Sequence, residues 1–296
     1  MGYGHRRRIL IYVSGGGNEG MGHIIRSSHL ANLLQEMGAD VLFSYPEVRE
    51  ALIPDWMRCP RSPVPMDPLR QINPVLAADF PLDLFVLDVM FPKDEWVQAA
   101  PKSVVIVGAG WAITKEVAAA ARLLVYQTGF PVFKQKISGA KYLMLGPAYK
   151  KRGEDKTDDV LISFGAGIPP EYTNALTEAF PRALMPDQGE MLYGLQRMAR
   201  IHVGSMGMST YESMAMGCVP IVVCRSTDHA NTAEKMDDLG TLITCGILAD
   251  APPKMLVSVV SDVLSRKEWL QQMAKRGMDL IDGNGLQRVA REVLRV

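Results

Sequence analysis

The run Ile9-Leu-Ile-Tyr-Val13 passes directly into Ser14-Gly-Gly-Gly17, so an apolar segment rich in β-branched residues is followed at once by a glycine-rich loop. The second half of the chain repeats this arrangement, with Val160-Leu-Ile-Ser163 leading into Phe164-Gly-Ala-Gly167. A buried parallel strand that turns through glycines into a helix is typical of the first βα unit of a Rossmann-like domain. Two such openings in one chain predict two domains of this type.

The rest of the chain supports this interpretation, because short apolar runs alternate with helical patterns along its whole length. This alternation predicts an α/β protein with doubly wound parallel sheets. The strand-like runs cover residues 9–13, 40–43, 84–87, 103–107, 160–164, 201–203, 219–223 and 241–244, and helices are expected at 23–37, 170–183, 210–216, 229–239 and 253–264.

A polar and charged segment, Lys150 to Asp159, lies between two of the strand-like runs and divides the chain nearly in half. We therefore expect an N-terminal domain over residues 1–149 and a somewhat shortened C-terminal domain over residues 158–296. Two such domains would face each other across a cleft. Ligands of these sheets bind beyond the carboxyl ends of the strands, so the functional residues are expected in the loops that follow them.

Composition excludes several classes of partner. The 296 residues include 32 Lys plus Arg and 32 Asp plus Glu, so no net field would attract nucleic acid. The four cysteines form no CxxC pair, which argues against a zinc ribbon or a disulfide framework. No apolar run is long enough to span a membrane, and Ile9 to Val13 is too short for the core of a signal peptide. We expect a cytoplasmic protein, and the sequence leaves its oligomeric state open.

The first glycine-rich loop is a poor match to a dinucleotide site. Gly15, Gly17 and Gly20 formally satisfy GxGxxG, but the apolar helical pattern begins only after Gly22. The second strand-like run also ends in Ser44-Tyr45, where a dinucleotide fold places an acidic residue for the ribose. A nicotinamide-dependent enzyme is therefore disfavoured.

His23 and Arg26 are the candidate functional side chains that follow this loop. A histidine in the first turn of a helix is disfavoured as imidazolium by the helix dipole, so neutral His23 could act as a general base. The alternative is a helix-start histidine that is bonded to a nearby backbone group. Arg26, one turn later, could pair with a phosphate, although an arginine at such a position is by itself more often a solvated surface charge.

A second candidate site lies between residues 201 and 212, where Ile201-His-Val-Gly204-Ser205 is followed by Met206-Gly207-Met208 and a helix start at Ser209-Thr210. Ser209 and Thr210 are residue types that cap helices, and free amides at a helix start bind anions such as a diphosphate. Glu212, in the first turn, could accept two hydrogen bonds from a ribose diol. Its alternative role is simple compensation of the helix dipole.

Five ordered motifs resemble those of the PseG/SpsG-like enzymes, the UDP-sugar hydrolases of pseudaminic acid biosynthesis and their spore-coat polysaccharide relatives. The motifs are Gly20–Ala31 (GxGHxxRxxxLA), Leu145–Arg152 (LGxxYxxLR), Ser163–Ala166 (SFGG), Gly207–Glu212 with Gly217–Pro220 (GGsTxxE and GvP), and Ile281–Val289 (DGxGxxR). The resemblance implies a GT-B fold, related to nucleotide-sugar glycosyltransferases such as MurG.

The resemblance also implies roles for individual residues: His23 as catalytic base, Glu212 on the uridine ribose, and the Gly207–Thr210 amides on the diphosphate. Asp88 matches an acidic strand-end position that faces the cleft. The expected substrate-binding residues are Gly20, Gly22, Arg26, Asp88, Tyr149, Phe164, Gly165, Ser205, Gly207, Met208, Ser209, Thr210, Glu212 and Asn231. Three departures stand out: Met206-Gly207 replaces a glycine pair, Asn231-Thr232 replaces an Asn-Gln pair, and the segment between Phe164 and Ile201 is too short for an extra strand and helix.

The sequence therefore predicts an enzyme that hydrolyses a UDP-linked deoxy amino sugar and releases UDP, in surface polysaccharide or nonulosonic acid biosynthesis. A GT-B glycosyltransferase with a UDP-sugar donor and a non-catalytic nucleotide-sugar binding protein are the alternatives. No metal and no cofactor is expected, in line with the lack of an Asp-x-Asp triplet.

Overall fold

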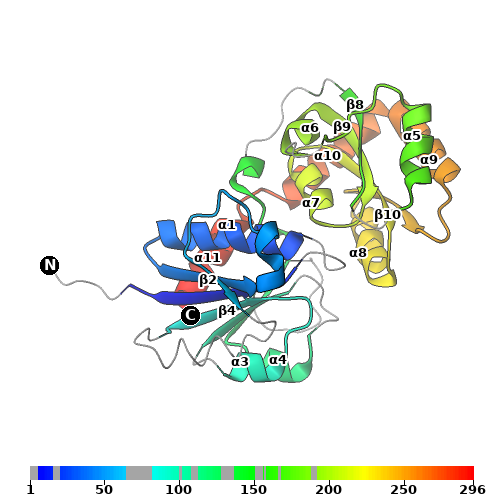
Figure 1. Ribbon diagram of the computed structural model, residues 1–296. Helices are drawn as coiled ribbons and strands as arrows, with labels where there is room; N and C mark the ends of the chain where they lie inside the picture. Colours follow the sequence, from blue (N-terminus) through cyan, green and yellow to red (C-terminus); the bar gives the residue numbers. More distant parts are fainter. Residues whose placement is uncertain are drawn as a thin grey trace. The chain divides into compact units, whose positions relative to one another are not determined.

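The computed structural model describes residues 6–15, 21–64, 82–99, 102–107, 113–127, 137–150, 156, 158–165, 168–187 and 192–296. The chain divides into two compact units. The first unit comprises Met1–Gly146 together with Asn284–Val296, and the second unit comprises Pro147–Gly283. Each unit contains one parallel sheet that is flanked by helices (Figure 1). The predicted α/β class with two Rossmann-like sheets is confirmed.

The bounds of the units differ from those that the sequence suggested. The chain crosses between the units at Gly146–Pro147 and again at Gly283–Asn284, whereas we expected the C-terminal domain to run from residue 158 to residue 296. The last helix, α11 (Gly285–Arg295), packs instead on α1 (Gly22–Glu36) and η4 (Ala140–Tyr142) of the first unit. The physical reason is its apolar stripe, which needs a partner and finds it in the first core; the buried residues of the stripe are Leu286, Val289, Ala290 and Val293.

The first sheet has the strand order β3-β2-β1-β4-β5-β6-β7, and all its pairings are parallel. Its strands are β1 (Arg8–Val13), β2 (Asp40–Pro46), β3 (Arg61–Val64), β4 (Leu84–Asp88), β5 (Ser103–Val107), β6 (Leu123–Tyr126) and β7 (Ile137–Ser138), and η2 (Glu47–Leu52) follows β2. The strand order reverses between β1 and β4. This topological switch point is the place where doubly wound sheets bind their ligands.

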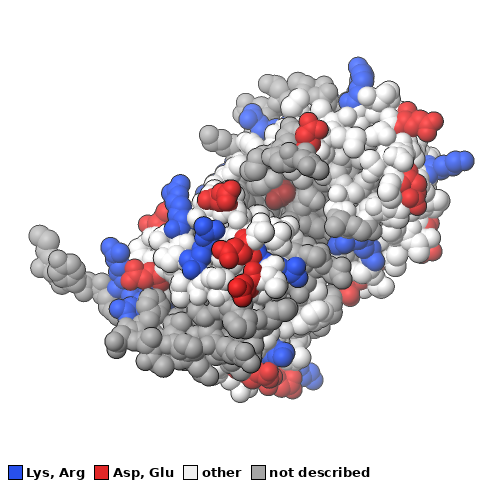
Figure 2. Space-filling view, viewed as in Figure 1, with Lys and Arg blue, Asp and Glu red and all other residues white. Residues whose placement is uncertain are grey.

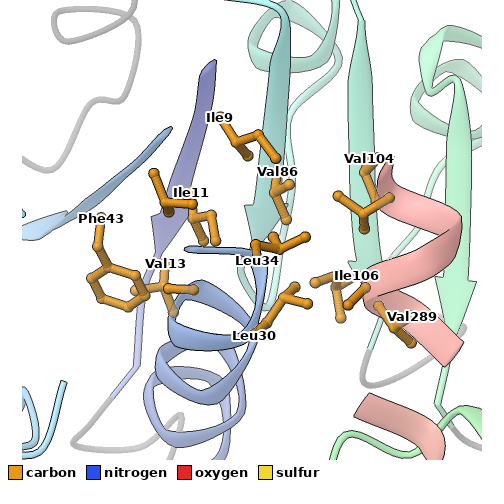
Figure 3. Packing of buried hydrophobic residues seen from close by; sticks show 14 of the residues in the cluster. Ile9, Ile11, Val13, Leu30, Leu34, Phe43, Val86, Val104, Ile106 and Val289 are labelled. Carbon is orange, nitrogen blue, oxygen red and sulfur yellow. The ribbon is translucent and has the colours of Figure 1, made fainter. Parts of the chain in front are cut away.

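Both faces of the first sheet are covered, which explains why its strands are apolar without alternation. Ile9, Ile11 and Val13 of β1 lie in a cluster with α1 and α11, while Leu10 and Tyr12 lie in the cluster on the opposite face. That face is covered by α3 (Asp94–Gln98) and α4 (Lys115–Ala120) (Figure 1). Figure 3 shows the first cluster, in which Leu30 and Leu34 of α1 and Val289 of α11 pack against the sheet.

The second sheet has the order β11-β10-β9-β8 and is also entirely parallel. Its strands are β8 (Asp158–Ser163), β9 (Ala199–Ser205), β10 (Val219–Cys224) and β11 (Ile243–Ile247). The helices are α5 (Pro170–Ala179), α6 (Leu192–Met198), α7 (Met208–Ala215), α8 (Thr227–Asp238), α9 (Pro253–Ser265) and α10 (Lys267–Leu280). In Figure 1, α5 and α9 cover one face of this sheet, and α6 and α7 lie against the other.

The segment between β8 and β9 is short. In its described part, Leu184 forms an isolated parallel bridge with Leu161 of β8. The Leu184 N–H donates to the Val160 carbonyl at 2.8 Å, and the Ile162 N–H donates to the Leu184 carbonyl at 2.9 Å. Prolines at positions 181 and 186 flank Leu184 and have no N–H to extend such a ladder. The sheet therefore continues beyond β8 by a single residue pair.

Surface and cysteine properties agree with the composition. Lys and Arg side chains are intermixed with Asp and Glu over the described part of the face in Figure 2. The four cysteines are buried free thiols. Among the described residues, no helix is both long enough and apolar enough to cross a membrane.

Candidate functional site

The first cluster of polar residues lies at the switch point of the first sheet. Asp88 ends β4 directly beside Val13, the end of β1, and the Ser14 N–H donates to the Asp88 carbonyl at 3.3 Å. Because side chains alternate along a strand, Asp88 projects to the same face as Val86, which is the face covered by α1. The Asp88 side chain is completely buried.

Three side chains of α1 surround the Asp88 carboxylate. His23 Nδ1 lies 2.7 Å from Oδ1, and Ser27 Oγ donates to Oδ2 at 2.6 Å. Arg26 donates twice, from Nε to Oδ2 at 2.8 Å and from Nη2 to Oδ1 at 2.5 Å. His23, Arg26 and Ser27 are three and four residues apart, so one face of the helix presents all of them to Asp88.

The charges in this cluster determine which proton His23 carries. Burial alone would raise the pKa of Asp88, but the charge of Arg26 and the hydrogen bonds from Arg26 and His23 hold that pKa well below its usual range. Asp88 is therefore a carboxylate at neutral pH and can only accept hydrogen bonds. His23 must donate from Nδ1, which leaves Nε2 with the lone pair that a general base requires.

This geometry bears on the alternatives that the sequence left open for these residues. Among the described residues, His23 Nδ1 is bonded to a side-chain carboxylate. Arg26 is 4% exposed and binds Asp88 through two of its nitrogens, so it is not a solvated surface charge. Gly22 is the first residue of α1, and the side chain of the N-cap residue before it makes no capping hydrogen bond. Gly20 lies outside the described residues.

The second cluster lies where β9 runs into α7. The helix begins at Met208 with Gly207 as its N-cap, two residues earlier than Thr210, the expected first residue of the helix. Thr210 has a different role from the cap that we predicted, because its Oγ1 accepts from the Gly207 N–H and donates to the Ser205 carbonyl, both at 3.2 Å. The Thr210 side chain thus stabilises the turn that precedes α7. Ser209 follows Met208 in the first turn.

The loop after β8 meets this turn at the carboxyl ends of β8 and β9. The Gly165 N–H donates to Ser205 Oγ at 3.3 Å, which brings the ends of β8 and β9 together. The ring of Phe164 packs edge-on against Tyr172 in the core, so Phe164 contributes its backbone to the loop surface. Asn231 is exposed on α8, which follows β10.

Glu212 and Tyr149 form the third contact among the expected residues. Glu212, on α7, is partly buried, and α7 packs against η5 (Pro147–Lys150), which carries Tyr149. Burial raises the pKa of Glu212 to about 7, and the hydrogen bond from Tyr149 acts in the opposite direction. A carboxyl group with such a pKa changes its charge at neutral pH.

A buried network below α7 contains residues that the sequence did not single out. His202 Nε2 donates to the Ser163 carbonyl at 3.2 Å, so its Nδ1 accepts from Ser213 Oγ at 2.7 Å. Gln196 Nε2 in turn donates to Ser213 Oγ at 3.0 Å. Burial lowers the pKa of His202 to about 4, which keeps the ring neutral. This network ties α6 and α7 to β8 and β9.

Sequence reasoning also missed Ser27 and Gln127 in the first unit. Gln127 follows β6 with the same side-chain parity as Val125, so it projects to the face that Asp88 occupies. Among the described residues, neither the oxygen nor the nitrogen of its buried amide has a hydrogen-bond partner. Serines and glutamines carry no motif of their own. A polar residue directly after an apolar strand was the one available signal.

Comparison with known proteins identifies the fold. No family model matches the chain. Over 136 residues it is 27% identical to the spore coat polysaccharide biosynthesis protein SpsG of Bacillus subtilis (strain 168), a match that covers 45% of this chain and 40% of that relative.

Solved glycosyltransferases are similar over almost the whole chain. MurG of Acinetobacter baumannii has a TM-score of 0.71 at 13% identity, covering 98% of this chain and 100% of its own. The calicheamicin glycosyltransferase CalG4 has a TM-score of 0.70 at 15% identity, covering 98% of each chain. The spinosyn rhamnosyltransferase SpnG, solved with thymidine diphosphate, has a TM-score of 0.66 at 12% identity and covers 96% of this chain and 100% of its own. The chain therefore has the GT-B fold.

Proposed function

We propose that this protein hydrolyses a UDP-linked deoxy amino sugar, in surface polysaccharide or nonulosonic acid biosynthesis. The observation that carries this proposal is the buried Asp88 carboxylate 2.7 Å from His23 Nδ1, which would accept the Nδ1 proton so that Nε2 can act as the base. The similarity to SpsG, which is named for spore coat polysaccharide biosynthesis, supports the proposed pathway class.

In the proposed reaction, His23 Nε2 removes a proton from water as the water oxygen attacks the anomeric carbon. The bond between that carbon and the diphosphate oxygen breaks, and UDP leaves with the electron pair. The imidazolium that forms is stabilised by the negative charge of Asp88, as in other His–Asp pairs. Arg26 and Ser27 keep Asp88 ionised and oriented, so they support the base through the carboxylate.

The second unit supplies the features that suit the nucleotide. The Met208 and Ser209 amides at the start of α7 would bind the diphosphate, where the helix dipole favours negative charge. The Gly207 and Thr210 amides already donate within the turn, to Thr210 Oγ1 and to the Gly207 carbonyl. A Cβ built on Gly207 would meet no atom within 4 Å, so a ligand has room to approach the backbone there. Glu212 would accept hydrogen bonds from the ribose hydroxyls. Charge developing on the departing diphosphate would be stabilised by the same amides.

A glycosyltransferase is the second candidate, because the same His23 Nε2 would deprotonate an acceptor hydroxyl as readily as a water. The solved proteins of the same fold reported above are glycosyltransferases, which favours this candidate. Fold alone does not separate the two reactions, since they differ only in the nucleophile. A nucleotide-sugar binding protein without catalysis is the third candidate.

Nucleotide release from a panel of UDP-sugars, with CMP-sugars and dTDP-sugars as comparisons, separates the three candidates. Release of UDP without any acceptor supports hydrolysis. Release that requires an added sugar or lipid acceptor supports transfer. Binding without release under either condition supports the third candidate, and the absence of both binding and release contradicts all three.

A further inference from the structure

We propose that His202 is a positioning residue for the diphosphate subsite of the second unit, where it fixes the start of α7 through Ser213 and Gln196. This inference rests on the proposed function, in which the Met208 and Ser209 amides bind the diphosphate. The side chains of His202, Ser213 and Gln196 are at most 1% exposed. They therefore act on a ligand only through the backbone that they hold.

The network of these side chains connects two backbone carbonyls. His202 Nε2 donates to the carbonyl of Ser163, the last residue of β8, at 3.2 Å. At the other end, Gln196 Nε2 donates to the carbonyl of Ser209, in the first turn of α7, at 3.0 Å. Ser213 Oγ lies between them, 2.7 Å from His202 Nδ1 and 3.0 Å from Gln196 Nε2. The network therefore links the end of β8 to the first turn of α7.

The direction of these hydrogen bonds follows from the two ends of the network. A carbonyl oxygen only accepts, so His202 carries its proton on Nε2, and Nδ1 has a free lone pair. Ser213 Oγ consequently donates to Nδ1 and accepts from Gln196. Burial lowers the pKa of His202 to about 4, so the ring keeps this acceptor at neutral pH. Turning over the Gln196 amide would set its oxygen against the Ser209 carbonyl, so the network admits one arrangement.

The backbone of β9 leaves room for the His202 ring. Gly204 lies two residues after His202, on the same side of the strand. A Cβ on Gly204 would stand 3.0 Å from His202 Nε2 and 2.6 Å from the Ser163 carbonyl oxygen. Any side chain at this position would push the ring away from the carbonyl that it binds. The glycine and the histidine of β9 therefore serve the same contact.

Ser205 makes a second connection between the same segments. Its Oγ accepts from the Gly165 N–H at 3.3 Å, and its carbonyl accepts from Thr210 Oγ1 at 3.2 Å. The Met208 and Ser209 amides are thus held by Ser205 before the helix and by the network within it. Donors that are fixed before a ligand binds need no reorganisation when it does, which strengthens the interaction.

The test is calorimetric binding of UDP near neutral pH, with folding of each variant checked by circular dichroism. His202→Phe keeps a planar ring and removes both hydrogen bonds, so UDP should bind about tenfold more weakly, the equivalent of about one hydrogen bond. His202→Asn, whose side-chain oxygen can take the place of Nδ1, should recover part of this affinity. Ser213→Ala should weaken binding in the same way as His202→Phe, and it places no larger group in the core.

Thr241→Val is the matched control. Thr241 Oγ1 is also buried and donates to a backbone carbonyl, that of Met236, at 2.9 Å, but Thr241 precedes β11 at the amino-terminal edge of the sheet. This variant should lose stability in urea and bind UDP like the wild type. Unchanged UDP affinity in both His202→Phe and Ser213→Ala would overturn the inference, because a network that only stabilises the fold predicts that result. An equal loss of affinity in Thr241→Val would also overturn it.

A second measurement needs no ligand and separates this inference from the proposed function. The amide signals of Met208, Ser209 and Gly165 in nitrogen-15 NMR spectra should shift and broaden in Ser213→Ala, which changes no aromatic ring, but not in Thr241→Val. Unchanged signals in Ser213→Ala would overturn the inference. A wild-type protein that binds no UDP would instead contradict the proposed function, and the NMR comparison would still decide whether the network positions the turn.

Discussion

At the scale of single residues, the polar cluster of the first unit is built around one carboxylate that stays charged although it is completely buried. Asp88 can do so because Arg26, His23 and Ser27 together donate to both of its oxygens. An isolated carboxylate in such a place would be neutral. The same three contacts fix the tautomer of His23, so stability and the proposed catalysis share one set of hydrogen bonds.

Replacing His23 by alanine should lower turnover roughly 10²-fold or more while leaving the affinity for the nucleotide-sugar unchanged, because general-base catalysis contributes about that much. Steady-state nucleotide release and calorimetric binding measure the two effects separately. His29→Gln, further along the same helix, serves as the control. Turnover that is unchanged in His23→Ala would remove His23 from the mechanism.

Replacing Asp88 by asparagine should reduce the free energy of unfolding by about 3 kcal/mol or more, since Arg26 is then a buried charge without its partner. The pKa of Asp88 is lower in the folded chain than in the unfolded chain. This group therefore stabilises the fold above about pH 4, and its contribution is lost as the pH falls through the folded pKa. Urea unfolding should show a smaller loss between about pH 5 and about pH 3 in the variant than in the wild type.

At the scale of elements, the sequence predicted the long buried strands well, because an apolar run that is covered on both faces needs no alternation to be recognised. The run at 84–87 became β4, and the run at 201–203 became the core of β9. The short strands β3 and β7 carry no such signal. Both lie at an edge of the first sheet, where pairing with a neighbour decides the conformation more than local preference does.

The start of α7 differs from the one that the capping preferences of the residues predict, because the turn before the helix determines where the helix begins. Ser209 and Thr210 are good capping residues, yet α7 begins at Met208 because extended Gly207 brings its own N–H to Thr210 Oγ1. The contacts of Asp88 with α1 were not derivable from spacing, since they join residues more than 60 positions apart. Only the resemblance to a known family connected these positions.

A matched pair of glycine substitutions tests how closely the start of α11 packs against the rest of the first unit. A Cβ on Gly285, the first residue of α11, would overlap the Leu143 carbonyl, and the Leu143 carbonyl carbon lies only 2.7 Å away. Gly285→Ala should therefore destabilise the protein by roughly 1–3 kcal/mol, as overpacking does. Gly194→Ala, inside α6 with no atom within 4 Å, should be neutral or stabilising by up to about 1 kcal/mol. Urea denaturation of both variants measures the contrast, and equal effects would contradict this view of the helix.

At the scale of the whole molecule, the second unit is an insertion in the first, because residues 147–283 interrupt a unit that resumes at Asn284. The two ends of the insertion lie together, as the contact between Gly283 and Tyr149 shows. No local pattern in the sequence indicated this, since an apolar stripe on a helix does not specify which core the helix joins. Tertiary packing alone assigns the helix.

The two units should behave differently when they are separated. Residues 147–283 expressed alone should fold and unfold cooperatively, because their core is complete and their ends meet. Residues 1–146 alone should aggregate or remain loosely packed, because they leave the α11 binding surface bare. Circular dichroism melting and proton NMR dispersion of the two fragments measure this. A well-folded 1–146 fragment would show that α11 is dispensable.

The placement of α11 also sets an order of events during synthesis on the ribosome. The first core includes Leu286, Val289 and Val293, which are translated only after the entire second unit. Domains commonly fold as they emerge, starting from the N-terminus. The first unit is translated first, but its core is complete only after α11 has been translated. The second unit should therefore fold before the surface that carries His23. A premature stop late in the message would consequently damage the beginning of the protein.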